Sequence, residues 1–236
     1  MTEPGAYFLG AVLTIPVVSA AVLALLPDDR TAARLNALAA FLTFVSAAVL
    51  FVERPSPGRY LIVDDLNVVF IVLSTFVGFT TSVFSGSYIA HELETGRLTP
   101  AYLRFYHAMY QTLMFGMNLA LLSNNVGLMW VAVELATLTT VLMVGIYRTP
   151  AALEAAWKYI LLGSVGIALA LFGTILVYLA AHATVGEGLD AMAWNVLVDK
   201  AAAFDPALLN LSFVFLLLGY GTKVGLVPLH AWLPDA

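Results

Sequence analysis

Seven stretches of mostly apolar residues alternate with short polar segments along the chain. Each stretch has about the 20 residues that a helix needs to cross a bilayer. Pro, Gly, Asn and charged residues, which end helices, separate them. The pattern predicts an all-α, polytopic transmembrane bundle of about seven helices, with a long polar loop over 182–206. The predicted spans are 5–26, 32–52, 66–88, 102–122, 126–147, 151–181 and 207–227.

Composition narrows the class of protein further. Hydrophobic residues make up 61% of the 236 residues and charged residues only 11%, with a net charge of −5. This excludes a soluble globular enzyme, and it excludes a nucleic-acid binder, which needs a basic patch. The absence of Cys excludes disulfides, thiolate catalysis and Cys-ligated clusters. No metal-ligand spacing or dinucleotide fingerprint occurs, so we expect no metal, no cofactor and the lipid bilayer as surroundings.

Basic residues in the connections predict the orientation of the helices. The first stretch is too long for a secretory signal and follows Glu3 rather than basic residues, so it is predicted to be a span. Cytoplasmic loops are enriched in Lys and Arg. One side would carry five basic residues and the other three, which places the N-terminus outside the cytoplasm. The first set is Arg30, Arg34, Arg97, Arg104 and Arg148, and the second is Arg54, Arg59 and Lys200.

Two charged residues stand where apolar ones are expected. Glu134 lies in the middle of the fifth span and Lys158 near the start of the sixth. A charge at the bilayer centre costs at least about 2.5–3.5 kcal/mol and commonly marks an ion pathway. The alternatives are a buried acid that only strengthens helix packing and a Lys that snorkels to the interface. Glu154 is the local helical partner of Lys158, and we further expect Glu134 and Lys158 to pair across the two helices.

The seventh span combines a lysine with residues that break helices. Lys223 is followed by Gly225 and Pro228 and preceded by Gly221. Pro228 cannot donate to the carbonyl of residue 224, and Gly loosens the same turn. The span is therefore predicted to break between 222 and 228, and broken helices form ion sites in transporters. The alternative is an ordinary proline kink with a snorkelling lysine.

Polar residues also line one face of the fourth span. His107, Gln111 and Asn118 lie at helical spacing, and His107 is either a packing hydrogen bonder or a proton relay. His230, beside the predicted break, has the same two interpretations. A membrane-embedded hydrolase using His230 and Asp235 is a weaker alternative, because no Ser or metal-ligand partner stands at a useful spacing.

These residues together resemble a known family. Glu134, Lys158 and Lys223 within Lys-x-x-x-x-Pro-Leu-His-x-Trp-Leu-Pro-Asp-Ala are similar to the antiporter-like proton-pumping subunits of complex I, membrane-bound hydrogenases and multisubunit sodium/proton antiporters. The segment 126–158, with Trp-Val-Ala-Val-Glu-Leu and Leu-Glu-Ala-Ala-Trp-Lys-Tyr, most resembles the F component of hydrogenase 4. The resemblance covers about residues 60–236, and the first two spans are generic.

The resemblance implies a role for each charged residue. Glu134 would bias the neighbouring lysine and link to the next subunit, Lys158 would lie near that glutamate, and Lys223 would take up and release the transported proton. Residues 1–60 would precede the first half of the proton-translocating module, within one membrane domain. Family members have a second half, so the chain is expected to be a fragment, a truncated product or one piece of a split subunit.

Two functions follow as expectations. One is translocation of protons or another cation by a subunit of a redox-driven complex in the bacterial plasma membrane, with no redox chemistry of its own. The other is a non-conducting structural or assembly subunit that retains the buried charges. In both, the partners are the other membrane subunits, including a possible second half.

Overall fold

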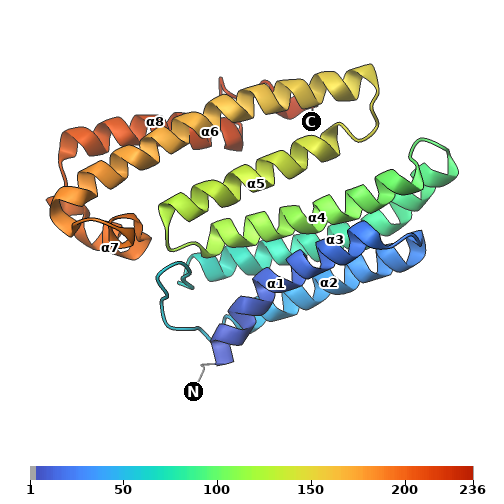
Figure 1. Ribbon diagram of the computed structural model, residues 1–236, viewed down its shortest axis with the longest axis horizontal. Helices are drawn as coiled ribbons and strands as arrows, with labels where there is room; N and C mark the ends of the chain where they lie inside the picture. Colours follow the sequence, from blue (N-terminus) through green and yellow to red (C-terminus); the bar gives the residue numbers. More distant parts are fainter. Residues whose placement is uncertain (1–3, 236) are drawn as a thin grey trace.

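The computed structural model describes residues 4–235, which form seven long helices and one short one (Figure 1). The predicted spans and the observed long helices agree in number and nearly in bounds. The helices are α1 (Pro4–Leu25), α2 (Asp29–Val49), α3 (Asn67–Glu94), α4 (Pro100–Leu122), α5 (Val126–Val144), α6 (Pro150–Val185), α7 (Trp194–Lys200) and α8 (Pro206–Val224). Within this range, 3₁₀ turns occur at Leu189–Met192, Ala201–Ala203 and Leu233–Asp235.

The starts of several helices follow from local sequence. The Asn125 side chain accepts hydrogen bonds from the backbone N–H groups of Gly127 and Leu128, each at 3.0 Å, and so caps α5. Asp205 caps α8 in the same way through Ala207, at 2.8 Å. Helices α4, α6 and α8 begin with Pro, whose missing N–H costs nothing at the first helical position.

Of the seven long helices, every one except α4 has the length and the apolar composition needed to cross a membrane. Helix α4 is the helix with the polar face, and it packs against α1, α3 and α5. His107, Gln111 and Asn118 are fully buried there. Protein rather than lipid therefore surrounds its polar residues, which explains how a less apolar helix occupies the middle of the bundle. The chain is an integral membrane protein.

The exterior of the bundle is apolar, the reverse of a soluble protein. Leu25, Phe84, Leu161, Val165 and Phe213 are among many large apolar side chains that are exposed. Polar side chains such as those of Asn36, Ser82 and Gln111 are fully buried instead. An apolar surface around a partly polar interior is what a bilayer requires of a helical bundle.

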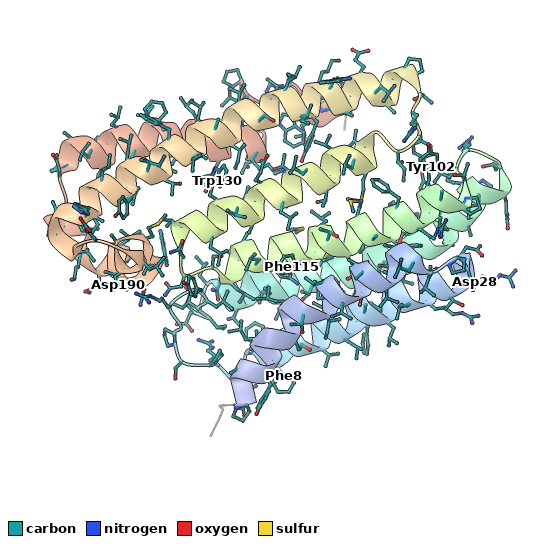
Figure 2. The ribbon with its side chains drawn as sticks, in the orientation of Figure 1. Phe8, Asp28, Tyr102, Phe115, Trp130 and Asp190 are labelled. Atoms are coloured by element: carbon teal, nitrogen blue, oxygen red, sulfur yellow. The ribbon has the colours of Figure 1, made fainter. Side chains whose placement is uncertain are left out.

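The connections between helices gather at two ends, as the sequence predicted. Figure 2 shows Asp28 and Tyr102 at one end and Asp190 at the other, with the N-terminus (Figure 1). An ion pair of 3.7 Å between Arg59 and Asp190 ties the second and sixth connections together.

Helices α6 and α8 make the most extensive helix contact in the described chain. Small residues of α6 face α8: the Ser212 hydroxyl donates to the Gly173 carbonyl at 2.9 Å. A Cβ atom added at Gly219 would lie 2.7 Å from the Ala170 Cβ. Backbones approach this closely only where side chains are absent, as in small-residue helix interfaces. This contact fixes where the end of α8, with Lys223, lies against α6.

Candidate functional site

Helix α8 ends directly after Lys223, within the predicted interval. Its last residue is Val224, and Gly225 adopts a left-handed conformation with φ of 80°. The N–H of Leu226 donates to the Gly221 carbonyl at 2.8 Å and that of Gly225 to Thr222 at 3.3 Å. This is a Schellman ending, which Gly permits because it has no Cβ. Pro228 lies beyond the break, so Gly225 ends the helix and Pro228 prevents its resumption.

Lys223 is half-buried, and its ammonium is held by one aromatic side chain of α6. Its Nζ donates to the Tyr159 hydroxyl at 2.6 Å and lies 4.9 Å from the centre of the same ring. An ammonium group has only donors, so the Tyr159 oxygen must accept. Tyr159 is buried, with 6% of its surface exposed. The broken helix thus presents Lys223 to the buried Tyr159 of α6.

The Tyr159 hydroxyl is also bonded to a third helix. It lies 2.7 Å from the Thr140 hydroxyl of α5, and the Thr140 hydroxyl lies 2.9 Å from the backbone carbonyls of Ala136 and Thr137. Because Thr140 has one hydrogen and directs it to a carbonyl, it accepts from Tyr159. Sequence reasoning missed Tyr159 and Thr140. The one available signal was the polar ring of Tyr159 directly after Lys158.

Glu134 lies half-buried on α5, and Lys223 is the charge that acts on it electrostatically. Its Oε2 atom is buried without a hydrogen-bond partner. Within residues 4–235, no cation comes within the 4.0 Å of an ion pair with it. Glu134 is therefore a near neighbour of Lys223 rather than its salt-bridge partner.

The pairing predicted between Glu134 and Lys158 is wrong. The Lys158 ammonium lies 2.8 Å from Glu154 and 2.7 Å from Asp235, and its side chain is 45% exposed. The local partner, Glu154, was predicted correctly. Asp235 was not, because the chain reverses after Gly225 and brings its carboxylate across α6. Helix α6 has 36 residues and is about 54 Å long, so Lys158 can lie near the membrane surface, as snorkelling requires.

The segment after the break folds back over Tyr159. The Trp232 indole donates to the Thr222 carbonyl at 2.8 Å, and its ring packs edge-on against Tyr159 with centroids 4.7 Å apart. Trp232 therefore fixes the Tyr159 ring and uses a carbonyl of the last turn of α8. His230 lies in this segment, and its Nδ1 is buried without a partner.

A cavity of about 490 Å³ lies beside Lys223, between α3, α4 and α5. Its lining is apolar except for Ser74 and Lys223, and includes Phe70, Met117 and Val133. The cavity supplies no carboxylate to Lys223, so the polar contacts of the ammonium come from the side of Tyr159.

His107 lies in a separate polar group, in the α1–α4 part of the bundle. Both of its ring nitrogens lack a hydrogen-bond partner, and its ring packs beside Tyr106. Gln111 instead donates to the Asn36 side chain at 2.8 Å, and Asn118 to the Val12 carbonyl at 3.2 Å. In the described part of the chain, no three His, Asp or Glu side chains are placed to hold a metal ion.

Comparison with known proteins shows what the chain is similar to. Residues 123–236 match the family described as NADH:quinone oxidoreductase/Mrp antiporter, transmembrane. The hydrogenase-4 component F homolog of Methylacidiphilum infernorum (isolate V4) is 58% identical over 226 residues, which cover 96% of this chain and 48% of that protein. The matched segment, nearly half of the chain, belongs to this family of antiporter-like membrane subunits.

Two solved structures contain chains with the same fold. A chain of respiratory complex I from Thermus thermophilus superposes with a TM-score of 0.74 at 26% identity, over 95% of this chain and 46% of that one. A chain of the membrane-bound sulfane sulfur reductase, an archaeal respiratory membrane complex, has the same fold, with a TM-score of 0.73 at 20% identity over 96% and 47%. The chain spans about half the length of the relatives it matches.

Proposed function

We propose that the chain translocates protons as part of a redox-driven membrane complex, with Lys223 as the group that takes up and releases each proton. Relatives of the family are named as components of hydrogenase and NADH-quinone oxidoreductase complexes. The chain would form the first half of the proton-translocating module of such a complex. It would act beside other membrane subunits, oriented with its N-terminus outside the cytoplasm.

One observation carries the proposal: Lys223 is the lysine whose ammonium is held at a helix break without an ion-pairing carboxylate. Lys158 has two carboxylates at salt-bridge distance, which keep it charged. A lysine whose charged form is held by a hydroxyl, a ring and a more distant carboxylate can change protonation at smaller cost than one in a double salt bridge.

Glu134 would set the balance between the two states of Lys223. Its charge favours the ammonium, so movement of Glu134, or neutralisation of its carboxylate by a neighbouring subunit, would favour proton release. A change of tenfold in that balance corresponds to about 1.4 kcal/mol, and moving one charge across 100 mV costs about 2.3 kcal/mol. A change of a few tenfold factors in the protonation balance of Lys223 therefore matches the free energy of moving one proton across the membrane.

Lys223→Arg tests the proposal, because Arg stays charged at every accessible pH. Measured as proton translocation by the assembled complex in proteoliposomes, Lys223→Arg should assemble and abolish translocation, while Lys200→Arg on the exposed end of α7 should leave it unchanged. Wild-type rates with Lys223→Arg would overturn the proposal and favour a structural subunit that only retains the buried charges.

A further inference from the structure

We infer that the Tyr159 hydroxyl is the positioning group that holds Lys223 in its charged state and thereby sets the pH at which Lys223 releases its proton. The inference rests on the proposed function of Lys223 and adds to it a group that regulates the same site. It is carried by the hydrogen bond of 2.6 Å from the Lys223 ammonium to the Tyr159 oxygen.

While Lys223 is charged, each hydrogen bond around Tyr159 has one direction. The Lys223 ammonium can only donate, so the Tyr159 oxygen accepts from it. The Thr140 hydroxyl donates its single hydrogen to the backbone of α5, so it accepts the hydrogen of Tyr159. A neutral lysine amine has a lone pair and can accept. Tyr159 can then turn its O–H from Thr140 toward Lys223. The orientation of one buried hydroxyl therefore distinguishes the two protonation states.

The position of that hydroxyl is held from the other side of the ring. Trp232 packs edge-on against Tyr159 and bonds the Thr222 carbonyl, next to Lys223 in the chain. Tyr159 and the end of α8 are thus clamped by the same indole. The hydroxyl can rotate about its C–O bond, but the ring cannot leave Lys223 without breaking the Trp232 contacts.

The other charged and titratable groups near this site are engaged elsewhere or act at longer range. From α6, Lys158 is paired with Glu154 and Asp235. From α5, Glu134 acts on Lys223 through its charge without an ion pair. The segment after the break brings His230, with its Nδ1 buried and unbonded. Tyr159 is the hydrogen-bond acceptor that the described chain gives to the Lys223 ammonium.

Tyr159→Phe isolates the hydroxyl, because phenylalanine keeps the ring that Trp232 and the ammonium contact. The measurement is the pH dependence of proton translocation by the assembled complex in proteoliposomes. Without the acceptor, the ammonium is destabilised relative to the amine, so the alkaline midpoint of the profile should fall by about one pH unit. Tyr178→Phe, on the same helix and beside His182, should leave the midpoint in place.

A second pair of variants keeps the test decisive if Tyr159→Phe does not assemble. Thr140→Val removes the acceptor of the Tyr159 hydrogen and should shift the midpoint in the same direction by less, while Thr140→Ser restores the hydroxyl and the wild-type profile. A Tyr159→Phe profile that superposes on the wild type, or equal shifts in both Thr140 variants, would overturn the inference. If Lys223→Arg is inactive at the same time, the proposed function stands and this inference alone fails.

Discussion

The two halves of the bundle both bury polar side chains, but they satisfy them differently. In α1–α4, buried amides bond one another or the backbone, while the His107 ring, on a regular helix, has no hydrogen-bond partner: Gln111 bonds Asn36, and Asn118 bonds the Val12 carbonyl. In α5–α8, a lysine ammonium is bonded to one phenol at the end of a broken helix. Buried polarity by itself therefore does not mark an ion site. We expect an ion site where a titratable group with few partners lies beside irregular backbone.

The distinction has a physical basis. An amide pair across two helices stabilises one packing arrangement and has no second state. A lysine held by a hydroxyl can exist as the ammonium or as the amine, and a distant carboxylate shifts the balance toward the ammonium. Variants of these polar groups should accordingly affect different properties: stability and assembly for the amides of α1–α4, and translocation for Lys223 and its neighbours in α5–α8.

The largest loss of stability is expected at the contact between α6 and α8. Gly219→Ala would place a Cβ 2.7 Å from the Ala170 Cβ, with backbone atoms as near, so the helices must separate. We expect a loss of about 3 kcal/mol, seen as a lower melting temperature of the protein in nanodiscs. Gly10→Ala, whose Cβ would meet nothing within 4 Å, should not destabilise. Equal melting temperatures for both variants would show that the α6–α8 contact is looser than described.

In the first half, Gln111→Leu should lower stability and leave translocation unchanged. It leaves the buried Asn36 side chain without its partner, at a cost of about 2 kcal/mol. Replacing both residues by Leu should recover most of the loss, because no unpaired group remains. Loss of translocation by Gln111→Leu at full assembly would erase the distinction between the halves.

Glu134→Gln should lower translocation on the order of tenfold, because it removes the negative charge that acts on Lys223. The glutamine keeps nearly the same shape, so assembly should be preserved. Glu94→Gln, at the exposed end of α3, is the matched control and should have the wild-type rate. The same proteoliposome assay measures both, and an unaffected Glu134→Gln rate would remove Glu134 from the mechanism.

The smallest effect is expected at Asp28, which caps α2 outside the membrane-spanning segments. Hydrogen bonds from Thr31, at 2.8 Å for the backbone N–H, hold the pKa of Asp28 below its usual value. A lowered carboxylate pKa contributes stability at neutral pH that is lost as the pH falls through that pKa. Asp28→Ala should therefore lower the melting temperature slightly at pH 7 and not in acid. Asp28→Asn, which also caps helices, should remove the pH dependence and keep most of the stability.

Much of this architecture could be predicted because long apolar stretches admit few alternatives in a membrane. The bounds of α1, α4 and α6 follow from hydropathy, Pro and cap residues, and the end of α8 from Gly225. Helix α7 was not predicted within the loop over 182–206. Its seven residues, which begin at Trp194, are too few to show a helical repeat of apolar positions.

The site was less predictable, because its contacts depend on how helices rotate against one another. Lys223 stood out as a charge beside helix breakers, and Glu154 as a partner four residues from Lys158. That Tyr159 would face Lys223, and Asp235 would face Lys158, depends on the α6–α8 contact and on the chain reversal at Gly225. Neither can be derived from residue spacing along the chain.

We expect that Lys223, and not Lys158, changes protonation during translocation. The chain has three lysines, at 158, 200 and 223, so ¹⁵N-lysine labelling confined to this chain and NMR of the side-chain nitrogens in the assembled complex can follow each one. The Lys223 signal is assigned by its loss in Lys223→Arg. Lys223 should pass from ammonium to amine within the pH range of translocation, while Lys158 stays an ammonium. A Lys223 signal that remains an ammonium across that whole range would contradict the account.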